Sequence, residues 1–377
     1  MSEAATLDPK PRELDLSWMK RRGEWNTRAE PKDSDDGLTL ADIQIGAYGD
    51  IPDESDNLSG RPRGAAVRED AYRIGGYQLR SKKDIWLHNA SWLYEEALQR
   101  QWSSATDIPW HTIQPLPDDI EQAECQLATF LTEVEFVAGD VPASWLAKAS
   151  PDYFEARSLL LAQVMDESRH MDVFRKRAFA NGGGLMQRLG GTAGVVGSID
   201  MAQDFNEMSA KLHLSGEGAV LTIFRMGELM AYNDAEKYMY RLCAQDEARH
   251  VAFGVMHMRY VAEAAPELME EIHCYLDESE RGGTIGGPAG GSAQPSGQPP
   301  ANAASNQNPA AGGASSEALA ILLGGGKDKF DEGFNKLRAI RQRQGIEYIK
   351  RVRAAGFGER FENGRAPERL CRMAQDA

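Results

Sequence analysis

Two segments of the chain carry the same five-residue pattern, Asp-Glu-x-Arg-His, at residues 166–170 and 246–250. In each copy the glutamate and the histidine are three residues apart, so on a helix both side chains lie on one face, about one turn apart. A carboxylate and an imidazole in this arrangement can bind the same metal ion. The repeated pattern therefore predicts two helices that face each other across a metal site.

The spacing of apolar residues predicts that most of the chain is helical. Between residues 84 and 280, apolar residues recur at intervals of three and four, and proline and glycine lie mostly at the breaks. Runs of β-branched residues are few. We therefore expect an all-α fold, a four-helix bundle core with additional helices. The expected helices span 84–102, 118–139, 152–180, 201–230, 234–264 and 266–280.

A dinuclear site built on two such patterns needs two more glutamates, one from each of two further helices. In an antiparallel helical hairpin, facing residues lie at equal distances from the turn. Glu135 paired with Glu167, and Glu217 paired with Glu247, each have a midpoint on turn-forming residues, Ser-Pro-Asp and Tyr-Asn-Asp. The predicted metal ligands are therefore Glu135, Glu167, His170, Glu217, Glu247 and His250.

Glu133 is an alternative to Glu135, because its midpoint with Glu167 also falls on a turn. The two side chains point about 200° apart on a helix, so only one of them can face the metals. We prefer Glu135, since Leu131 and Ala138 share its side of the helix.

Two other residues near the second pair are weaker candidates. His213 lies one turn before Glu217 and is an alternative extra ligand, although an ordinary core or surface histidine is the favoured interpretation. Glu228 is a poorer ligand than Glu217, because its midpoint with Glu247 falls inside a predicted helix.

The aspartate and the arginine of each pattern are expected to support the ligands. Each aspartate directly precedes a ligand glutamate, and an aspartate in that position can accept the free imidazole N–H of a metal-bound histidine and fix the ring. We expect Asp166 to serve the histidine of the second pattern, and Asp246 to serve the histidine of the first. Arg169 and Arg249 are expected to pair with these aspartates or with neighbouring helices.

With these residues the chain resembles the ferritin-like di-iron carboxylate superfamily over residues 84–280. The repeated pattern is most similar to the hydroxylase subunits of bacterial multicomponent monooxygenases. The stretch RQWSSATDIPW, residues 100–110, resembles a segment of ribonucleotide reductase small subunits and their ligand-binding oxidase relatives. This resemblance implies that Trp102 contacts Asp246, and it implies a homodimer. Phe174 stands where the reductase subunits have a radical tyrosine, so a reductase role is not expected.

The resemblance also implies a cofactor and a type of reaction. The expected cofactor is two iron ions, with Mn/Fe as the alternative, and the expected function is a di-iron oxygenase or oxidase that activates O₂. It would hydroxylate, N-oxygenate or desaturate a small organic substrate, with a reductase or ferredoxin as electron donor. A ferroxidase or a non-catalytic metal-stabilised subunit is the alternative. Five side chains favour an apolar or aromatic substrate: Phe130, Phe174, Phe224, Met226 and Met230.

Composition excludes other classes of function. The chain has 42 basic and 57 acidic residues, a formal net charge of −15, and no basic run of the kind that follows a phosphate backbone. No segment approaches the roughly 20 apolar residues of a membrane helix, and the first residues lack the apolar core of a signal peptide. The four cysteines are scattered. We expect a cytoplasmic protein without nucleic-acid or membrane partners.

The composition also divides the chain into four parts. Residues 1–80 are rich in Asp, Gly, Pro and Arg and predict an extended or partly disordered arm, followed by the helix bundle at 81–281. Residues 282–316 are almost purely Gly, Ala, Pro, Ser, Asn and Gln, which predicts a flexible linker. Residues 317–377 are expected to form C-terminal helices that pack on the bundle.

Overall fold

The structure is a computed structural model of the chain. It describes residues 14, 16–19, 28–32, 37–66, 72–73, 76–181, 183–187, 193–281 and 313–377. Within these ranges the chain forms helices and irregular segments. Its β-pairing there is limited to isolated bridges between Glu54 and Ser81 and between Leu79 and Ala149.

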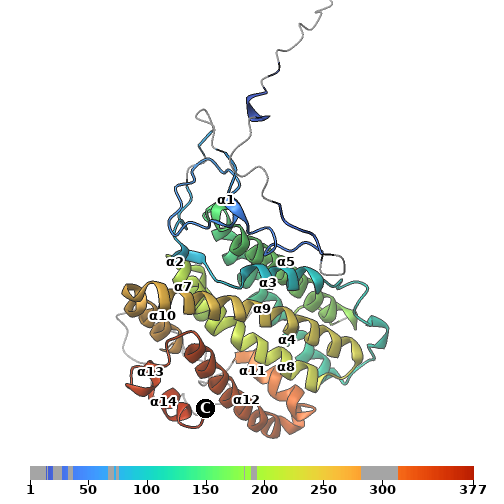
Figure 1. Ribbon diagram of the computed structural model, residues 1–377. Coiled ribbons are helices and arrows are strands. Elements are labelled where there is room, and N and C mark those ends of the chain that lie inside the picture. The colour runs from blue at the N-terminus through green and yellow to red at the C-terminus, as the bar shows by residue number, and fades with distance from the viewer. Residues whose placement is uncertain are drawn as a thin grey trace, which may run out of the picture.

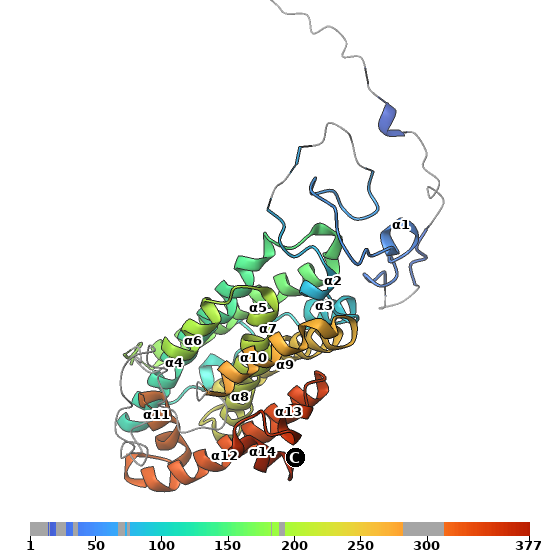
Figure 2. The same cartoon turned by 90° about the vertical axis from the view of Figure 1, so that its left-hand side faces the viewer.

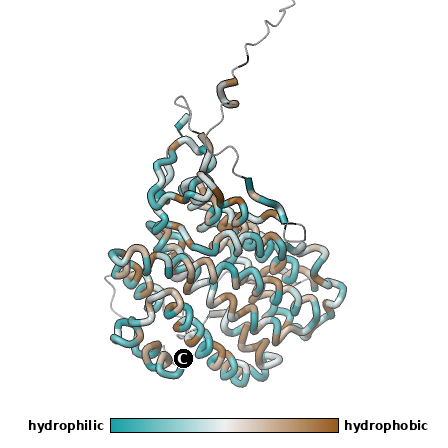
Figure 3. Tube along the Cα trace, in the orientation of Figure 1, coloured by the Kyte–Doolittle hydropathy of each residue, from teal (hydrophilic) through white to brown (hydrophobic). Residues whose placement is uncertain are grey.

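Four long helical elements form the centre of the molecule (Figures 1 and 2). α4 (Asp118–Leu146) packs along α5 (Phe154–Ala180), and α8 (Gly218–Met230) packs along α9 (Asp234–Ala264). Contacts between α5 and α9 join the two hairpins. Hydrophobic and hydrophilic positions alternate along these helices (Figure 3), as expected where one face of each helix is buried.

Local sequence fixes the two hairpin turns at the predicted places. Before the short 3₁₀ helix η3 (Pro151–Tyr153), the Ser150 hydroxyl accepts the backbone N–H of Asp152 at 3.2 Å. Before α9, the Asn233 side chain accepts the backbone N–H of Glu236 at 2.9 Å. Such caps satisfy N–H groups that have no partner inside a helix.

The helix expected at 84–102 is two helices, α2 (Lys82–Ile85) and α3 (Ala90–Gln99). The chain leaves helical geometry at Trp86, whose carbonyl oxygen lies 2.9 Å from Nδ1 of the buried His257 on α9. This long-range hydrogen bond replaces one that a continuous helix would make. The single-helix expectation was therefore wrong.

α4 continues seven residues beyond its expected end at 139 and includes Pro142. Proline removes one backbone hydrogen bond from a helix interior. Val141, Pro142 and Trp145 are all buried, so packing on both sides of the proline offsets that loss.

The helix expected at 201–230 consists of three parts. α7 (Phe205–Ser209) is followed by a π-helical segment, η4 (Ala210–Glu217), which continues into α8. A further helix, α6 (Ala193–Asp200), precedes them and was not predicted. The π-helical segment carries Glu217 at its end, and π-helical turns are frequent at functional sites.

After α9, the 3₁₀ helix η5 (Pro266–Leu268) leads into α10 (Met269–Arg281), close to the range expected from the sequence. None of the described helices is both long and apolar enough to span a membrane.

The described part of the N-terminal arm is anchored to α5. It contains the short helices η1 (Ser17–Met19) and α1 (Gly46–Gly49). The guanidinium of Arg63 donates to Glu155 Oε2 at 2.9 Å, and Gln44 donates to Glu155 Oε1 at 3.0 Å. Arg63 is only 4% exposed and Glu155 is fully buried. A buried ion pair thus ties this otherwise extended segment to the first hairpin.

The C-terminal part covers the side of the bundle opposite the arm (Figures 1 and 2). α11 (Gly313–Gly324) packs on α4 and on α12 (Phe330–Ala354), with the 3₁₀ helix η8 (Lys327–Lys329) between them. Two short helices follow, α13 (Glu359–Glu362) and α14 (Glu368–Ala374).

The predicted linker ends earlier than expected. Residues 282–312 lie outside the described residues, but 313–316 already belong to α11. Ser316 is 3% exposed and accepts a hydrogen bond from Arg341 on α12. Ala318 and Leu322 then join the hydrophobic core. Burial by the rest of the fold therefore makes the last residues of this Ala/Ser-rich stretch helical.

Candidate metal centre

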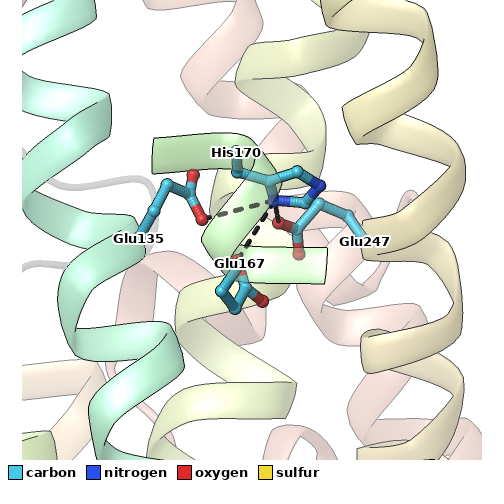
Figure 4. A group of neighbouring side chains, drawn as sticks. All are labelled: Glu135, Glu167, His170 and Glu247. Carbon is cyan, nitrogen blue, oxygen red and sulfur yellow. Dashed lines mark hydrogen bonds and ion pairs between the residues drawn. The ribbon is translucent and has the colours of Figure 1, made fainter. Parts of the chain in front are cut away.

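Six buried carboxylate and imidazole side chains converge inside the bundle from α4, α5, η4 and α9. They form two groups, Glu135/Glu167/His170/Glu247 and Glu167/Glu217/Glu247/His250. Within each group the potential ligand atoms lie within 4.8 Å of one another. Figure 4 shows the first group. The two groups share two glutamates, so the arrangement has room for two ions bridged by carboxylates.

The first group is centred on Nδ1 of His170. This nitrogen lies 3.1 Å from Glu167 Oε2, 3.3 Å from Glu247 Oε1 and 3.6 Å from Glu135 Oε2. The three carboxylates come from α5, α9 and α4 respectively (Figure 4).

The second group is centred on Nδ1 of His250, which lies 2.8 Å from Glu167 Oε1 and 3.4 Å from Glu247 Oε2. Glu167 and Glu247 therefore each direct one oxygen toward His170 and the other toward His250. This is the geometry of a carboxylate that bridges two ions. Glu217 completes the second group from the end of η4.

Several ligand atoms of this cluster lack the partners that buried polar atoms need. Among the described residues, Glu135 Oε1, Glu167 Oε1, both oxygens of Glu247 and Nδ1 of His250 have no partner in hydrogen-bond geometry, although Glu167 Oε1 and Nδ1 of His250 lie 2.8 Å apart. These residues are at most 2% exposed. Buried carboxylates without partners are costly, and metal cations would compensate all of them at once. Oxygen and imidazole donors suit iron and manganese, so the residues fit a dinuclear centre of these metals.

The electrostatics of the cluster also favour added positive charge. Burial, followed by the charge of Glu167, raises the pKa of Glu135 well above its usual range. Burial and the charge of Glu247 do the same to the pKa of Glu217. Burial would also raise the pKa of Glu167, but the neighbouring His250 and His170 lower it below the usual range.

The aspartates of the two patterns hold the outer nitrogen of the opposite histidine. Asp246 Oδ2 lies 3.3 Å from Nε2 of His170, and Asp166 Oδ2 lies 3.3 Å from Nε2 of His250. When Nε2–H donates to the aspartate, the Nδ1 lone pair faces the glutamates. Each aspartate thus selects the tautomer that can bind a metal ion.

The arginines connect the two patterns. Arg169 donates to Asp246 Oδ2 at 3.0 Å, and Arg249 donates to Asp166 Oδ2 at 3.0 Å. Each arginine also bonds the aspartate of its own pattern. The two arginines and the two aspartates balance one another in charge. Because each arginine also pairs with the aspartate of the other helix, these ion pairs link α5 to α9.

Trp102, which follows α3, completes this outer layer. Its indole Nε1–H donates to Asp246 Oδ2 at 2.7 Å, and its ring is stacked at 6.5 Å from the ring of His170. The contact implied by the resemblance is therefore present in the geometry.

Three candidates lie outside both groups. Glu133 is half-buried on α4 and does not belong to either group. Glu228 accepts a hydrogen bond from Arg241 at 2.8 Å. His213 is fully buried, but its Nε2 lies 3.1 Å from Gln163 Oε1 rather than among the carboxylates.

Gln163 is the residue near the centre that the sequence analysis missed. Its Nε2 donates to Glu217 Oε1 at 3.2 Å. The signal was available, since Gln163 lies four residues before Glu167 and so shares its helical face. Only the arrangement of the helices, however, brings it to Glu217.

Apolar side chains pack next to the first group. The Phe224 ring lies 5.9 Å from the His170 ring, and the Phe174 ring lies 5.3 Å from that of Phe224. Both phenylalanines are fully buried. The other three apolar residues named from the sequence, Phe130, Met226 and Met230, belong to or pack against the same hydrophobic cluster.

The similarity of this chain to known proteins is found in its structure and not in its sequence. No family model and no curated protein matches the sequence. An R2-like ligand-binding oxidase mutant with an aerobically reconstituted Mn/Fe cofactor is 15% identical and has a TM-score of 0.53, and the match covers 76% of this chain and 99% of that chain. A second mutant of this type is 14% identical with a TM-score of 0.52, over 71% of this chain and 94% of that chain. The chain therefore has the all-α, ferritin-like bundle fold of these oxidases.

Proposed function

We propose that the chain binds two metal ions in this centre and acts as an oxidoreductase of the oxidase or monooxygenase type. One observation carries the proposal: Glu167 and Glu247 each direct one oxygen toward His170 and the other toward His250. The Mn/Fe cofactors named for the structurally similar oxidases support it.

The residues have distinct tasks in such a centre. Bound iron ions, or an Mn/Fe pair, supply the capacity to activate O₂. Glu167 and Glu247, which belong to both groups, would be shared by the two ions, while Glu135 and Glu217 would each hold one of them. The buried rings of Phe224, which lies against His170, and of Phe174 behind it make this side of the centre apolar.

We propose a small apolar or aromatic substrate that is hydroxylated, N-oxygenated or desaturated. The support for this class is the apolar packing of Phe174 and Phe224 beside His170. In a hydroxylation, one atom of O₂ enters a C–H bond and the other leaves as water, which consumes two electrons and two protons. A reductase or ferredoxin would deliver the electrons, and we propose a homodimer as the working assembly.

The first test is metal content. We expect about two iron or manganese ions per chain after anaerobic reconstitution, measured by elemental analysis. The double variant Glu167→Gln/Glu247→Gln is expected to lose both ions, because it removes both bridging carboxylates. Glu228→Gln is the matched control, since Glu228 bonds Arg241 outside the centre, and it is expected to retain both ions.

The second part of the test is O₂ uptake by the reduced, loaded protein. Uptake that rises with an added apolar or aromatic substrate supports the oxygenase. Uptake that depends only on added Fe(II), with mineral formation, would contradict it and favour iron storage. Wild-type protein that binds no metal would refute the dinuclear centre.

A further inference from the structure

A line of hydrogen bonds leads from Glu217 away from the metal centre. Gln163 Nε2 lies 3.2 Å from Glu217 Oε1, and Gln163 Oε1 lies 3.1 Å from Nε2 of His213. Nδ1 of His213 then lies 2.9 Å from the Ser209 hydroxyl at the end of α7. All four residues are at most 2% exposed. We refer to Gln163, His213 and Ser209 as the relay.

The chemistry of Glu217 sets the direction of every bond in the relay. A carboxylate that binds a metal ion can only accept hydrogen bonds, so the amide of Gln163 must donate to it. The amide oxygen then faces His213 and must accept from Nε2–H. Nδ1 of His213 is therefore the acceptor of the Ser209 hydroxyl proton. Each donor has one acceptor, and no second arrangement satisfies all three bonds.

His213 remains neutral, as this arrangement requires. Burial, followed by the charges of His250 and His257, lowers the pKa of His213 to about 3. His213 also lies close against α9, because a Cβ atom added to Gly254 of that helix would lie 2.2 Å from the Cβ of His213. The centroid of the Phe253 ring, also on α9, lies 5.0 Å from the centroid of the His213 imidazole.

Glu135, the other glutamate that belongs to only one of the two groups, has no comparable hydrogen-bonded neighbour among the described residues. Glu135 Oε1 has no hydrogen-bond partner in the described part of the chain, and Glu135 Oε2 lies 3.6 Å from Nδ1 of His170. No residue equivalent to Gln163 contacts Glu135 among the described residues. The two metal positions therefore have the same kinds of ligands but differ in how firmly their terminal carboxylates are held.

We propose that Gln163 and His213 are positioning residues that fix Glu217 and make the two metal positions unequal. The position formed with Glu217 and His250 binds the first ion tightly. The position formed with Glu135 and His170 binds the second ion more weakly, and Glu135 is the carboxylate free to change its orientation when O₂ or substrate enters. This inference rests on the proposed dinuclear function.

The test is a stepwise anaerobic Fe(II) titration of the metal-free protein. We expect two binding steps in the wild type, the tighter lost in Glu217→Ala and the weaker lost in Glu135→Ala. Gln163→Met keeps the length of the side chain and removes both relay bonds. It is expected to weaken only the tighter step, by about 10-fold or more, the usual effect of losing a residue that orients a metal ligand.

A spectroscopic measurement separates positioning from general damage. With one equivalent of ⁵⁷Fe(II), the Mössbauer spectrum of the wild type is expected to show one ferrous environment. In Gln163→Met the same iron is expected to divide between two environments. Ser209→Ala removes only the outer bond and is expected to give a smaller shift in the same direction, and it serves as the second variant if Gln163→Met does not fold.

Two matched controls change buried side chains of the same types outside the relay. Gln126→Met removes an amide on α4 that bonds the Gln187 carbonyl at 3.1 Å, and His257→Gln changes a fully buried histidine that bonds Trp86 and Asn206. Both are expected to keep two unequal steps. If Gln163→Met and Ser209→Ala leave both steps unchanged, or weaken both equally, the relay has no positioning role although the dinuclear centre stands. Wild-type protein without bound metal would overturn both proposals.

Discussion

At the scale of single residues, the bundle interior holds a buried carboxyl group that the metal centre does not use. Glu124 on α4 is 1% exposed, and none of the described residues forms a hydrogen bond with its Oε2. Burial, followed by the charge of Glu236, raises the pKa of Glu124 to about 8. The nearby Arg177 lowers this pKa, but its guanidinium already donates to Glu121 at 2.7 Å and to Glu236 at 2.6 Å. Glu124 is therefore protonated in the folded protein at neutral pH.

This protonation makes stability depend on pH. Between the ordinary pKa of 4.5 and the raised value of about 8, the folded state holds a proton at Glu124 that the unfolded state has released. The free energy of unfolding therefore falls as pH rises through this window, by up to about 1.4 kcal/mol per pH unit from this group. Glu124→Gln cannot lose a proton, so we expect it to gain stability relative to the wild type from pH 5 to pH 8. Urea unfolding at both pH values measures the change, and a constant difference between the two proteins would contradict it.

At the scale of elements, the π-helical segment η4 is the feature with the greatest effect on the centre. It presents Glu217 and His213 while lying against α9 at Gly254. The approach is too close for any side chain on α9 at that point. Apolar spacing in the sequence is similar for an α-helix and for a helix with one π-helical turn, so the sequence predicted one continuous helix. In the folded chain η4 packs against α9, a contact that the local spacing of apolar residues does not report.

Gly254→Ala tests this close approach. The added methyl group would lie 2.2 Å from the Cβ of His213, so η4 and α9 must separate. We expect the free energy of unfolding to fall by about 1–3 kcal/mol, the usual cost of overpacking a core. Gly197→Ala on α6 is the control, because no atom that the structure describes lies within 4 Å of its added Cβ. That variant is expected to be unchanged or stabilised by about 0.5–1 kcal/mol. Urea unfolding measures the free energy of unfolding of both variants. Equal values for Gly254→Ala and Gly197→Ala would argue against the close packing of η4 on α9.

At the scale of the whole molecule, the C-terminal helices are joined to the bundle by buried polar contacts as well as apolar packing. Arg360 of α13 is fully buried and donates to Glu280 of α10 at 2.7 Å. The Tyr348 hydroxyl of α12 donates to the same glutamate at 2.8 Å. α12 also reaches the π-helical segment, where Arg351 donates to the Leu214 carbonyl at 3.0 Å.

Removing one partner of this buried pair should destabilise the molecule strongly. Arg360→Leu leaves the charge of Glu280 buried without its main partner, and we expect a loss of about 3–5 kcal/mol in the free energy of unfolding. Arg365→Leu is the control, because Arg365 is 24% exposed at its side chain and pairs with Asp277 and Glu270 near the surface. We expect it to cost about 1 kcal/mol or less. Similar losses in both variants, measured by chemical unfolding, would show that the C-terminal helices are not held through Arg360.

Much of the fold was predictable because its signals are local. The 3.6-residue period located the long helices, and turn-forming residues such as Pro151 and Asn233 located the hairpin turns. The division of 84–102 at Trp86, the extension of α4 past Pro142 and the start of α11 at Gly313 were not predicted. Each of these depends on contacts with residues distant in the sequence.

The residues of the candidate centre were also predictable from local signals. The repeated pattern and the equal distances from the turns identified the six potential ligands, which the fold brings into two overlapping groups. Their role as metal ligands remains a prediction until metal binding is measured.

Local sequence was enough to predict which residues share a helical face and which helices form hairpins, because both follow from the period of the helix and the chemistry of short turns. Only the packing of the helices brings Glu167 and Glu247 each to both histidines and Gln163 to Glu217, while no described residue bonds Glu135 in the same way. Those relations depend on how closely α4, α5, η4 and α9 approach one another. Helix separation is set by side-chain packing across the whole bundle, which no local pattern in the sequence contains.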